Sequence, residues 1–460
     1  MSETFMPNVE QLKTLQKNEI SSFRDVHIPG GPSDSCHDVN CLTGSIRSIT
    51  SADNSTSDSA KQKDYRLIVP GLCHPHIHLD KCFLLSHPKY ADLEINDGDF
   101  SEAMKLTSEA KSRFEHDDLM ERGRALIEES IRFGVTHMRA FVEVDFGVGM
   151  KCLDAGLALK TEFHGKCHIQ ICVFAQDPVF SHDYGSRSMT DLLEQAIKRP
   201  GVEVIGSTPY VEKSFALQEK NIQWAIETAK LHTLHLDFHL DYNLDSTQKP
   251  AVHTVIEQLR KAQWLTDRNI AGLKFRTVVL GHCTRLTLFD EDAWRNLRLE
   301  IGDLPISFVG LPTSDLFMMG RPAKGAGGSS RARGTLQVIE MIKKYDLNAV
   351  IGINNVGNAF TPYGSCDPMS LTSLGMGIYQ TGTKADAEVL LECVSTRARA
   401  AIGLDITRNL KLEVGSPASF VIFGKNGSRD FRARKSIQEL VYDAGVERTT
   451  IFEGKEVSST

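Results

Sequence analysis

Two histidines in segment 67–81 have the spacing of a metal-chelating pair. The segment begins as a short β-branched apolar run, breaks at Pro70 and Gly71, and then presents His76 and His78 two residues apart. Side chains at positions i and i+2 of an extended chain point to the same side. Two imidazoles placed in this way can bind one metal ion. A polar loop with scattered histidines is the alternative, which the flanking strand and the Leu-Asp-Lys that follows disfavour.

The same segment resembles the first-strand signature of the amidohydrolase superfamily, which consists of metal-dependent hydrolases on a (β/α)8 barrel. The Pro-Gly-Leu before the histidines and the His-Leu-Asp-Lys at the end are most similar to the cytosine deaminase branch. The resemblance implies an α/β fold, a (β/α)8 TIM barrel with a small β-sandwich domain built from both chain termini.

The pattern of apolar segments predicts the same organisation. Between residues 67 and 408, strand-like and helix-like segments alternate, as in a parallel sheet with crossover helices. We expect barrel strands at 67–70, 135–141, 167–174, 202–207, 235–241, 277–282, 306–311 and 349–353. We expect helices at 119–132, 191–198, 216–231, 252–262, 335–344 and 384–402.

The sandwich is expected to combine the two ends of the chain. Short strands are predicted at 23–28, 38–42 and 45–50, and again at 415–423 and 450–457. Residues 51–63 are rich in Ser, Asp, Asn and Lys and are typical of a surface loop. The predicted domains are therefore 1–66 and 409–460, which form the sandwich, and 67–408, which forms the barrel.

In a barrel of this kind the active site lies at the carboxyl ends of the strands. His239 follows the fifth predicted strand and resembles the third metal ligand of the superfamily, whereas His235 and Asp237 lie deeper and are expected to pack. His282 ends the sixth predicted strand and resembles the histidine that contacts the metal or polarises the bound water. The alternative for His282 is a core or loop histidine.

Four further residues are predicted to bind substrate. Gln176 resembles the glutamine with which cytosine deaminase-like enzymes hold a ring carbonyl and a ring nitrogen, because a carboxamide offers both a donor and an acceptor. A turn before Asp-Pro is its alternative. Asp315, Arg321 and Asn355 follow the seventh and eighth predicted strands. The glycine- and serine-rich tract 325–330 is expected to form a lid or substrate loop, not a phosphate cradle, because the Walker order is absent.

Two positions depart from the superfamily pattern. Asn354 stands where the superfamily has the aspartate that binds metal and accepts a proton, and Tyr242 stands where the branch has a proton-shuttling glutamate. An amide does not titrate, and a tyrosine with a reference pKa near 10 is a poor base. Asp241 is the best replacement carboxylate. Asp80, Asp245 and Asp315 are weaker replacements, since each is more typical of a loop cap or ion pair.

The sequence therefore predicts one divalent metal ion, expected to be Zn²⁺ with Fe²⁺ or Mn²⁺ as alternatives. Its expected ligands are His76, His78, His239, His282 and Asn354, and the expected catalytic residues are His282, Asp241 and Tyr242.

Three functions follow from these residues. The first is hydrolysis of a C–N bond in an amide, cyclic amide or amino-heterocycle by water that the metal activates. Ordinary cytosine deamination is not expected. The second is a lyase, cyclase or isomerase in which the metal acts as a Lewis acid. The third is a small-molecule-binding protein without activity, which the four retained histidines disfavour.

The amino-acid composition limits the classes of partner that we expect. The chain has 460 residues, 59 acidic and 52 basic side chains and a net charge of −7. This mild charge argues against nucleic acid or an anionic membrane as the main partner. Ten cysteines without a Cys-x-x-Cys pair, among them Cys167 and Cys172 in apolar runs, indicate reduced thiols. No signal peptide or membrane span is visible. We expect a cytoplasmic protein with a small-molecule substrate, and leave a homo-oligomer open.

Overall fold

The structure is a computed structural model that describes residues 20–30, 35–52, 65–181, 185, 187–268, 274–321, 333–424 and 433–459. The predicted tract 325–330 lies outside the described residues, and so does nearly all of the predicted loop 51–63.

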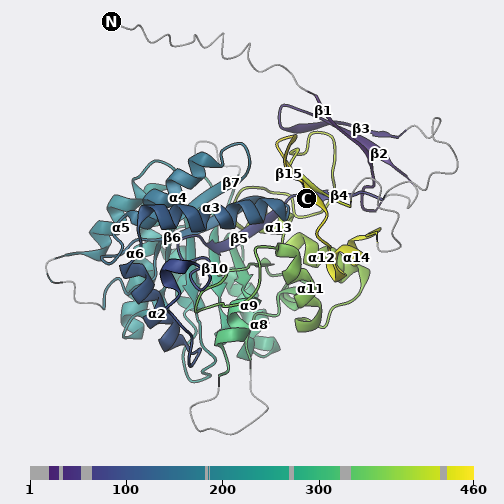
Figure 1. Ribbon diagram of the computed structural model, residues 1–460. Coiled ribbons are helices and arrows are strands. Elements are labelled where there is room, and N and C mark those ends of the chain that lie inside the picture. Colours follow the sequence, from purple (N-terminus) through teal and green to yellow (C-terminus); the bar gives the residue numbers. More distant parts are fainter. Residues whose placement is uncertain are drawn as a thin grey trace, which may run out of the picture.

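Eight parallel strands form a nearly closed barrel (Figure 1). They are β5 (Leu72–His78), β6 (Val135–Glu143), β7 (His168–Ala175), β8 (Val202–Ser207), β9 (His235–Leu240), β10 (Val278–His282), β11 (Ile306–Gly310) and β12 (Ala349–Ile351). Neighbours in sequence are neighbours in the sheet. The last strand meets the first just beyond the end of β12, where the Asn354 carbonyl accepts from His78 N at 2.8 Å and Asn354 N donates to the His76 carbonyl at 3.0 Å. The predicted barrel is thereby confirmed.

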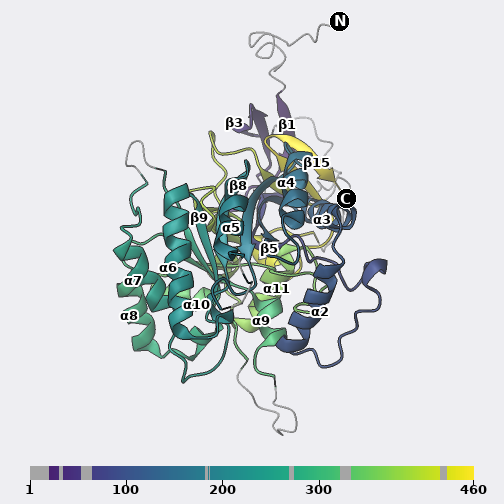
Figure 2. The same cartoon turned by 90° about the vertical axis from the view of Figure 1, so that its left-hand side faces the viewer.

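Helices surround the barrel (Figure 1). The outer helices are α3 (His116–Arg132), α4 (Lys151–Glu162), α5 (Met189–Ile197), α6 (Phe215–His232), α7 (Val252–Lys261), α8 (Glu291–Ile301) and α10 (Val338–Tyr345). The other helices are α2 (Phe100–Ser112), α9 (Pro312–Met318), α11 (Pro368–Ile378), α12 (Lys384–Cys393), α13 (Thr396–Ala401) and α14 (Ile437–Tyr442). Figures 1 and 2 show α2 and α9 toward the end of the barrel that lies away from the terminal strands.

The chain termini supply two antiparallel sheets. One contains β1 (Ser21–Val26), β2 (His37–Leu42) and β3 (Ser45–Ser51), and the other has the order β15 (Lys455–Ser459), β14 (Arg448–Phe452), β13 (Phe420–Phe423) and β4 (Leu67–Pro70). A buried apolar cluster joins the two sheets. Its members include Val39, Ile46, Ile68, Phe420 and Ile451.

The expectation that 67–70 is the first barrel strand is wrong. These residues form β4, which pairs antiparallel with β13, and the barrel begins at β5. The Pro70–Gly71 break is the point at which the chain passes from one sheet to the other. A Cβ on Gly71 would lie 2.3 Å from the Thr136 hydroxyl oxygen, so only glycine allows this close passage.

Two expected elements are divided in the structure. The predicted helix 384–402 is interrupted between α12 and α13 at Ser395, whose φ of −138° and ψ of −99° are not helical. The predicted strand 450–457 is a hairpin, β14 and β15, that turns at Gly454 with a φ of 80°. The pattern of apolar residues alone did not predict either break.

The cysteines and the helices can be compared with what the composition predicts. Cys167 and Cys172 are buried and free, as expected of core thiols. Among the described residues, no helix combines the length and the apolar character that crossing a membrane requires.

Asp118 ties the first turn of α3 to the segment that follows β5. Its carboxylate accepts from Lys89 Nζ at 2.7 Å, from the Tyr90 hydroxyl at 2.8 Å and from Arg122 Nη2 at 2.9 Å. The Glu115 backbone N–H donates to it at 2.7 Å. Although burial opposes ionisation, these donors lower the pKa of Asp118 from its ordinary value to about 2.

Replacing Asp118 with asparagine should therefore flatten the acid limb of the stability profile. The folded-state pKa lies below the unfolded value of about 3.9, so the stabilisation is complete above that value and is lost as pH falls toward 2. Urea unfolding of the wild type should show a loss of at most about 2 kcal/mol from this group between pH 5 and 2. Asp118→Asn should lack this component, and parallel profiles for the two proteins would contradict the assignment.

Candidate active site

Three imidazoles converge inside the carboxyl end of the barrel. The Nε2 atom of His239 lies 2.8 Å from that of His76 and 3.2 Å from that of His78. All three side chains are buried, and their ligand atoms lie within 4.8 Å of one another. His76 and His78 come from β5 and His239 from β9, so the convergence requires a closed barrel. The structure brings together the pair read from spacing and the third ligand taken from the resemblance.

The surroundings keep these imidazoles neutral. Burial lowers the pKa values of His76, His78 and His239 well below the ordinary value, and the positive charges that the neighbouring imidazoles would carry lower them further. The ring centroid of Phe174 lies 4.3 Å from that of His239. Gly281 admits the His76 ring beside β10, because a Cβ there would lie 3.1 Å from His76 Cε1. Neutral imidazole is the form that binds a metal ion.

Asn354 completes one side of this cluster. Its amide nitrogen donates to Ser314 Oγ at 2.8 Å, which fixes the orientation of the amide. Its Oδ1 is buried without a hydrogen-bond partner. The Nδ1 atoms of the three clustered histidines are also buried and unpartnered. The three Nε2 atoms converge beside the unpartnered Asn354 Oδ1. Together these atoms form a donor set that suits a divalent ion. The residues present therefore fit the predicted metal.

His282 lies beside the triad and is oriented from behind. Its Nδ1 is 2.8 Å from Asp315 Oδ1, and Asp315 Oδ2 accepts from the Thr335 hydroxyl at 2.9 Å. A cavity at this end of the barrel is lined by His78, Lys81, Phe100, Gln176, Tyr210, His239, Tyr242, His282, Asn354, Asn355 and Phe360. Asp315 is fully buried on α9 and does not line this cavity. It therefore positions His282 and does not have the substrate-facing position that we predicted. With Nδ1 engaged, the other nitrogen of His282 faces the cavity that this side chain lines. The described cluster of metal-ligating groups holds the three other histidines but not His282.

Asp241 does not face the histidines, contrary to its predicted catalytic role. Its two carboxylate oxygens accept from Ala251 N at 2.7 Å and from Val252 N at 3.1 Å, at the start of α7. The prediction assumed that strand alternation continues two residues past His239. β9 ends at Leu240, and Asp241 has a φ of 50°, so its side chain turns away from the triad.

The weaker carboxylate candidates are also engaged elsewhere. Asp80 Oδ2 accepts from Glu143 N at 2.7 Å, and the exposed Asp245 accepts from Thr247 N at 2.9 Å. Asp237 pairs with Arg139 Nη1 at 2.7 Å behind His76, and burial raises its pKa to about 7. No carboxylate lines the cavity within the described part of the chain.

Tyr242 forms part of an aromatic wall. Its ring centroid lies 4.0 Å from that of His282 and 6.1 Å from that of Phe100 on α2. Tyr210 and Phe360 complete the wall. Burial raises the pKa of Tyr242 well above 10, which removes it as a base at neutral pH. The prediction of Tyr242 as a proton carrier therefore conflicts with its surroundings.

The predicted substrate-binding residues fall into two groups. Gln176 and Asn355 line the cavity with the histidines, and their contact with substrate stays a prediction. Arg321 does not line this cavity. Its guanidinium donates to the carbonyl oxygens of Phe317 at 3.1 Å and Asp97 at 3.2 Å, and the side chain lies outside the cavity.

Lys81 is a cavity residue without a predicted role. In the sequence it is only the end of the His-Leu-Asp-Lys motif, yet in the structure it is buried and lines the cavity. Its ammonium pairs with Glu143, which also pairs with Lys111 of α2 at 2.6 Å. The one feature of the sequence that indicates a position near the metal site is that Lys81 follows His78 by three residues. The sequence does not show that the residues after β5 contact the segment after β12, where Phe83 N donates to the Val356 carbonyl at 2.9 Å.

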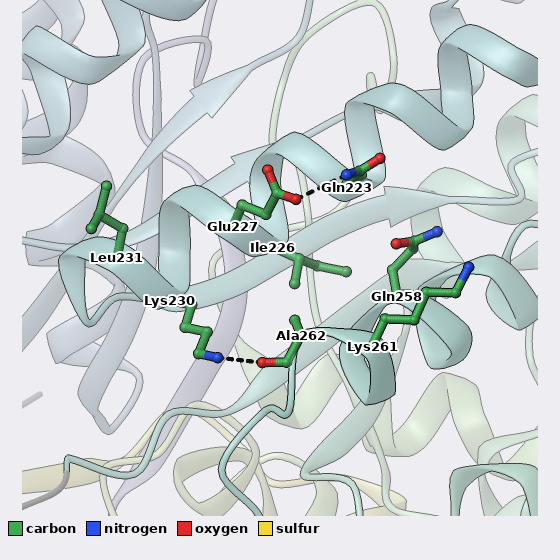
Figure 3. Close-up of a pocket in the computed structure, with 8 residues that line it drawn as sticks. All are labelled: Gln223, Ile226, Glu227, Lys230, Leu231, Gln258, Lys261 and Ala262. Carbon is green, nitrogen blue, oxygen red and sulfur yellow. Dashed lines mark hydrogen bonds between the residues drawn. The ribbon is translucent and has the colours of Figure 1, made fainter.

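A larger depression, of about 590 Å³, lies outside the barrel between α6 and α7 (Figure 3). Its walls are surface side chains of these helices, namely Gln223, Ile226, Glu227, Lys230, Leu231, Gln258, Lys261 and Ala262. Gln223 is bonded to Glu227 at 2.9 Å, and Lys230 is bonded to the Ala262 carbonyl. This depression is larger than the barrel cavity, but the residues that line it include no group of metal-binding side chains. We therefore place the candidate active site in the barrel cavity.

Comparisons with known proteins give the fold a context. No family model matches the chain, and no curated protein matches it. Among solved structures, 5-methylcytosine deaminase from Klebsiella pneumoniae with 5-fluorocytosine superposes with a TM-score of 0.78 at 21% identity, over 95% of this chain and 97% of that one.

Two other solved structures share this architecture. N-isopropylammelide isopropylaminohydrolase from Burkholderia multivorans has a TM-score of 0.73 at 19% identity, over 95% of this chain and 98% of that one. An adenosine deaminase from Xanthomonas campestris with bound zinc has a TM-score of 0.61 at 16% identity, over 91% and 88%. The chain therefore has the fold of the cytosine deaminase-like amidohydrolases that its first-strand motif resembles.

Proposed function

We propose that this chain is a metal-dependent hydrolase that cleaves a C–N bond of a small amide, cyclic amide or amino-heterocycle. The observation that carries the proposal is the convergence of His76, His78 and His239 on one point beside a cavity. The solved structures of similar fold are deaminases and an aminohydrolase, and one of them holds zinc.

The metal we propose is one divalent ion, zinc in the first instance, held by the three histidines and faced by Asn354. When bound there, such an ion would supply a water of lowered pKa, about 7, and a Lewis acid for a substrate carbonyl or imine. Neutral imidazoles and an amide would offset less of its charge than a ligand set that includes an aspartate.

The protein side chains would divide the remaining work. His282 would take up or release a proton at its cavity-facing nitrogen while Asp315 holds the ring in place. Gln176 and Asn355 would orient the substrate by hydrogen bonds. The aromatic wall that includes Phe100 would exclude bulk water during the reaction. We place the activity in the cytoplasm, in keeping with the buried free thiols such as Cys167 and Cys172.

Oxygen labelling tests the reaction class. The zinc-loaded protein would be incubated in ¹⁸O-labelled water with a panel of cyclic amides, pyrimidines and triazines, and products would be analysed by mass spectrometry. We expect one labelled oxygen in the product, loss of turnover on chelation, and recovery when zinc is added. A metal-dependent product without label would contradict hydrolysis and indicate a lyase, cyclase or isomerase.

A further inference from the structure

The ring of His76 has one nitrogen in the metal-binding cluster and one that faces a carboxylate behind it. Its Nε2 lies 2.8 Å from that of His239, whereas its Nδ1 lies 3.9 Å from Oδ1 of Asp237. Asp237 and His239 are two residues apart on β9, so both side chains point to the same side of the strand. The carboxylate therefore lies one layer below the triad, where it can act on the triad only through His76.

Neither of the two facing atoms has another partner. His76 Nδ1 and Asp237 Oδ1 are both buried without a hydrogen bond, which is unfavourable for any buried polar atom. A bridging water does not fit between them, because two hydrogen bonds of about 2.8 Å at one water hold its partners roughly 4.5 Å apart. The two atoms can satisfy each other only by a direct hydrogen bond, for which they must approach by about 1 Å.

Glycines beside the ring give it room for this adjustment. A Cβ on Gly281 would lie 3.1 Å from Cε1 and 3.3 Å from Nδ1 of His76, and a Cβ on Gly352 would lie 3.3 Å from its Cβ. Any side chain at either position would crowd the imidazole and its Nδ1 edge. With glycine at both, the ring can close the gap to the carboxylate.

The other oxygen of the Asp237 carboxylate is held by a fixed cation. Its Oδ2 accepts from Arg139 Nη1 at 2.7 Å, and both side chains are fully buried. The same guanidinium donates to Gln170 Oε1 at 2.7 Å and to the Ile402 carbonyl at 3.1 Å, which fixes its position. Because an arginine side chain can only donate, Oδ2 is the acceptor on that side and Oδ1 is left for the donor that His76 offers.

We propose that Asp237 is a positioning residue for the metal centre, because its Oδ1 accepts from Nδ1–H of His76 and so leaves Nε2 without a proton and free to bind the ion. The proposal rests on the metal centre of the proposed function. In the metal-free protein, the 2.8 Å contact within the triad is then a hydrogen bond that His239 donates to His76. Among the residues that the structure describes, no carboxylate forms an ion pair with His78 or His239, so this support is particular to His76.

Asparagine at position 237 gives a sharp test, because Arg139 determines which way the new amide points. The amide oxygen must face the guanidinium, which can only donate. The NH₂ group then faces His76 Nδ1 and donates to it, so the ring carries its proton on Nε2, the nitrogen needed for the metal. We expect Asp237→Asn to weaken zinc binding about 10- to 100-fold, measured at pH 8 by competition with a chromophoric chelator.

Two matched variants separate this effect from general damage to the buried cluster. Gln170→Met removes another partner of Arg139 but leaves Asp237 in place, so zinc affinity should stay within about threefold of the wild type. Adding Arg139→Met to Asp237→Asn frees the amide to turn its oxygen toward His76, and should recover most of the lost affinity. A merely structural role predicts the reverse, because the double variant loses more buried contacts than the single one. Circular dichroism would confirm that each protein is folded.

Nitrogen NMR of the zinc-free wild type tests the proposal even if the variants at position 237 do not fold. In protein labelled with ¹⁵N-histidine, the ring signals that are lost in His76→Ala belong to His76. We expect two-bond ¹H–¹⁵N correlations to show a proton on Nδ1 and none on Nε2.

Three results would overturn the proposal. These are a proton on Nε2 of His76 in the wild type, zinc affinity of Asp237→Asn within about threefold of the wild type, and a double variant that binds zinc no better than Asp237→Asn. If the wild type binds one zinc while any of these is found, the positioning role fails and the metal centre stands. A wild type that binds no zinc would contradict both.

Discussion

Alanine at position 239 is expected to reduce turnover of the best substrate in the panel by at least about a thousandfold, even with zinc in excess. His239 Nε2 lies at the point where the two β5 histidines converge, so its removal leaves two ligands from a single strand. Lewis-acid stabilisation by a metal amounts to several kcal/mol, and each 1.36 kcal/mol changes the rate tenfold.

The matched control is His253→Ala. His253 lies on α7 and pairs with Glu300 at 2.6 Å, outside the cavity. Its loss should change turnover less than twofold. Substrate turnover by His239→Ala within tenfold of the wild type would show that the reaction does not depend on the triad.

Methionine at position 139 is expected to lower the free energy of unfolding by about 3–5 kcal/mol. Arg139 is fully buried in the barrel, where it donates to Asp237 at 2.7 Å, to Gln170 at 2.7 Å and to the Ile402 carbonyl at 3.1 Å. Methionine retains much of the length of the arginine but leaves Asp237 and Gln170 buried without their shared donor.

Urea unfolding at neutral pH measures the effect on the zinc-free protein. Adding Asp237→Asn to Arg139→Met should restore part of the loss, because the buried acid that has lost its partner is then replaced by a neutral amide. Arg124→Met is the control, since Arg124 pairs with Glu162 on the surface and should contribute no more than about 1 kcal/mol. A loss in Arg139→Met no greater than that of the control would contradict the assigned role.

Local patterns in the sequence predicted the barrel and much of the site. The strand patterns before His239 and His282 were long enough to place both residues at strand ends, where β9 and β10 stop. His76 and His78 were readable from spacing because β5 is extended through both residues. Each of these predictions depended on a single strand and its carboxyl end.

The incorrect predictions involve residues just beyond a strand. Asp241 has a positive φ of 50°, which a strand pattern does not reveal. His282 and Asn354 also have positive φ values, of 66° and 69°, but both line the cavity. For Asp241 the left-handed conformation turns the carboxylate toward α7, and its predicted role fails. Asp315 was assigned to substrate because it follows a strand, but α9 directs it to His282.

Contacts between residues far apart in the sequence could not be predicted either. Lys81 reaches Glu143 on β6 and Gln176 after β7, and these distances along the chain leave no local signal. The position of 67–70 in the sandwich depends on pairing with β13, some 350 residues later. The break at Pro70 and Gly71 was visible, but the sequence did not show that it separates two sheets.

Metal content tests the central claim most directly. The purified wild type, His76→Ala and His253→Ala would be loaded with zinc, desalted and analysed by plasma mass spectrometry. The account predicts about one equivalent of zinc per chain in the wild type and in His253→Ala, and less than about a tenth of an equivalent in His76→Ala. Equal zinc in all three proteins, or none in the wild type, would contradict a metal centre built on His76, His78 and His239.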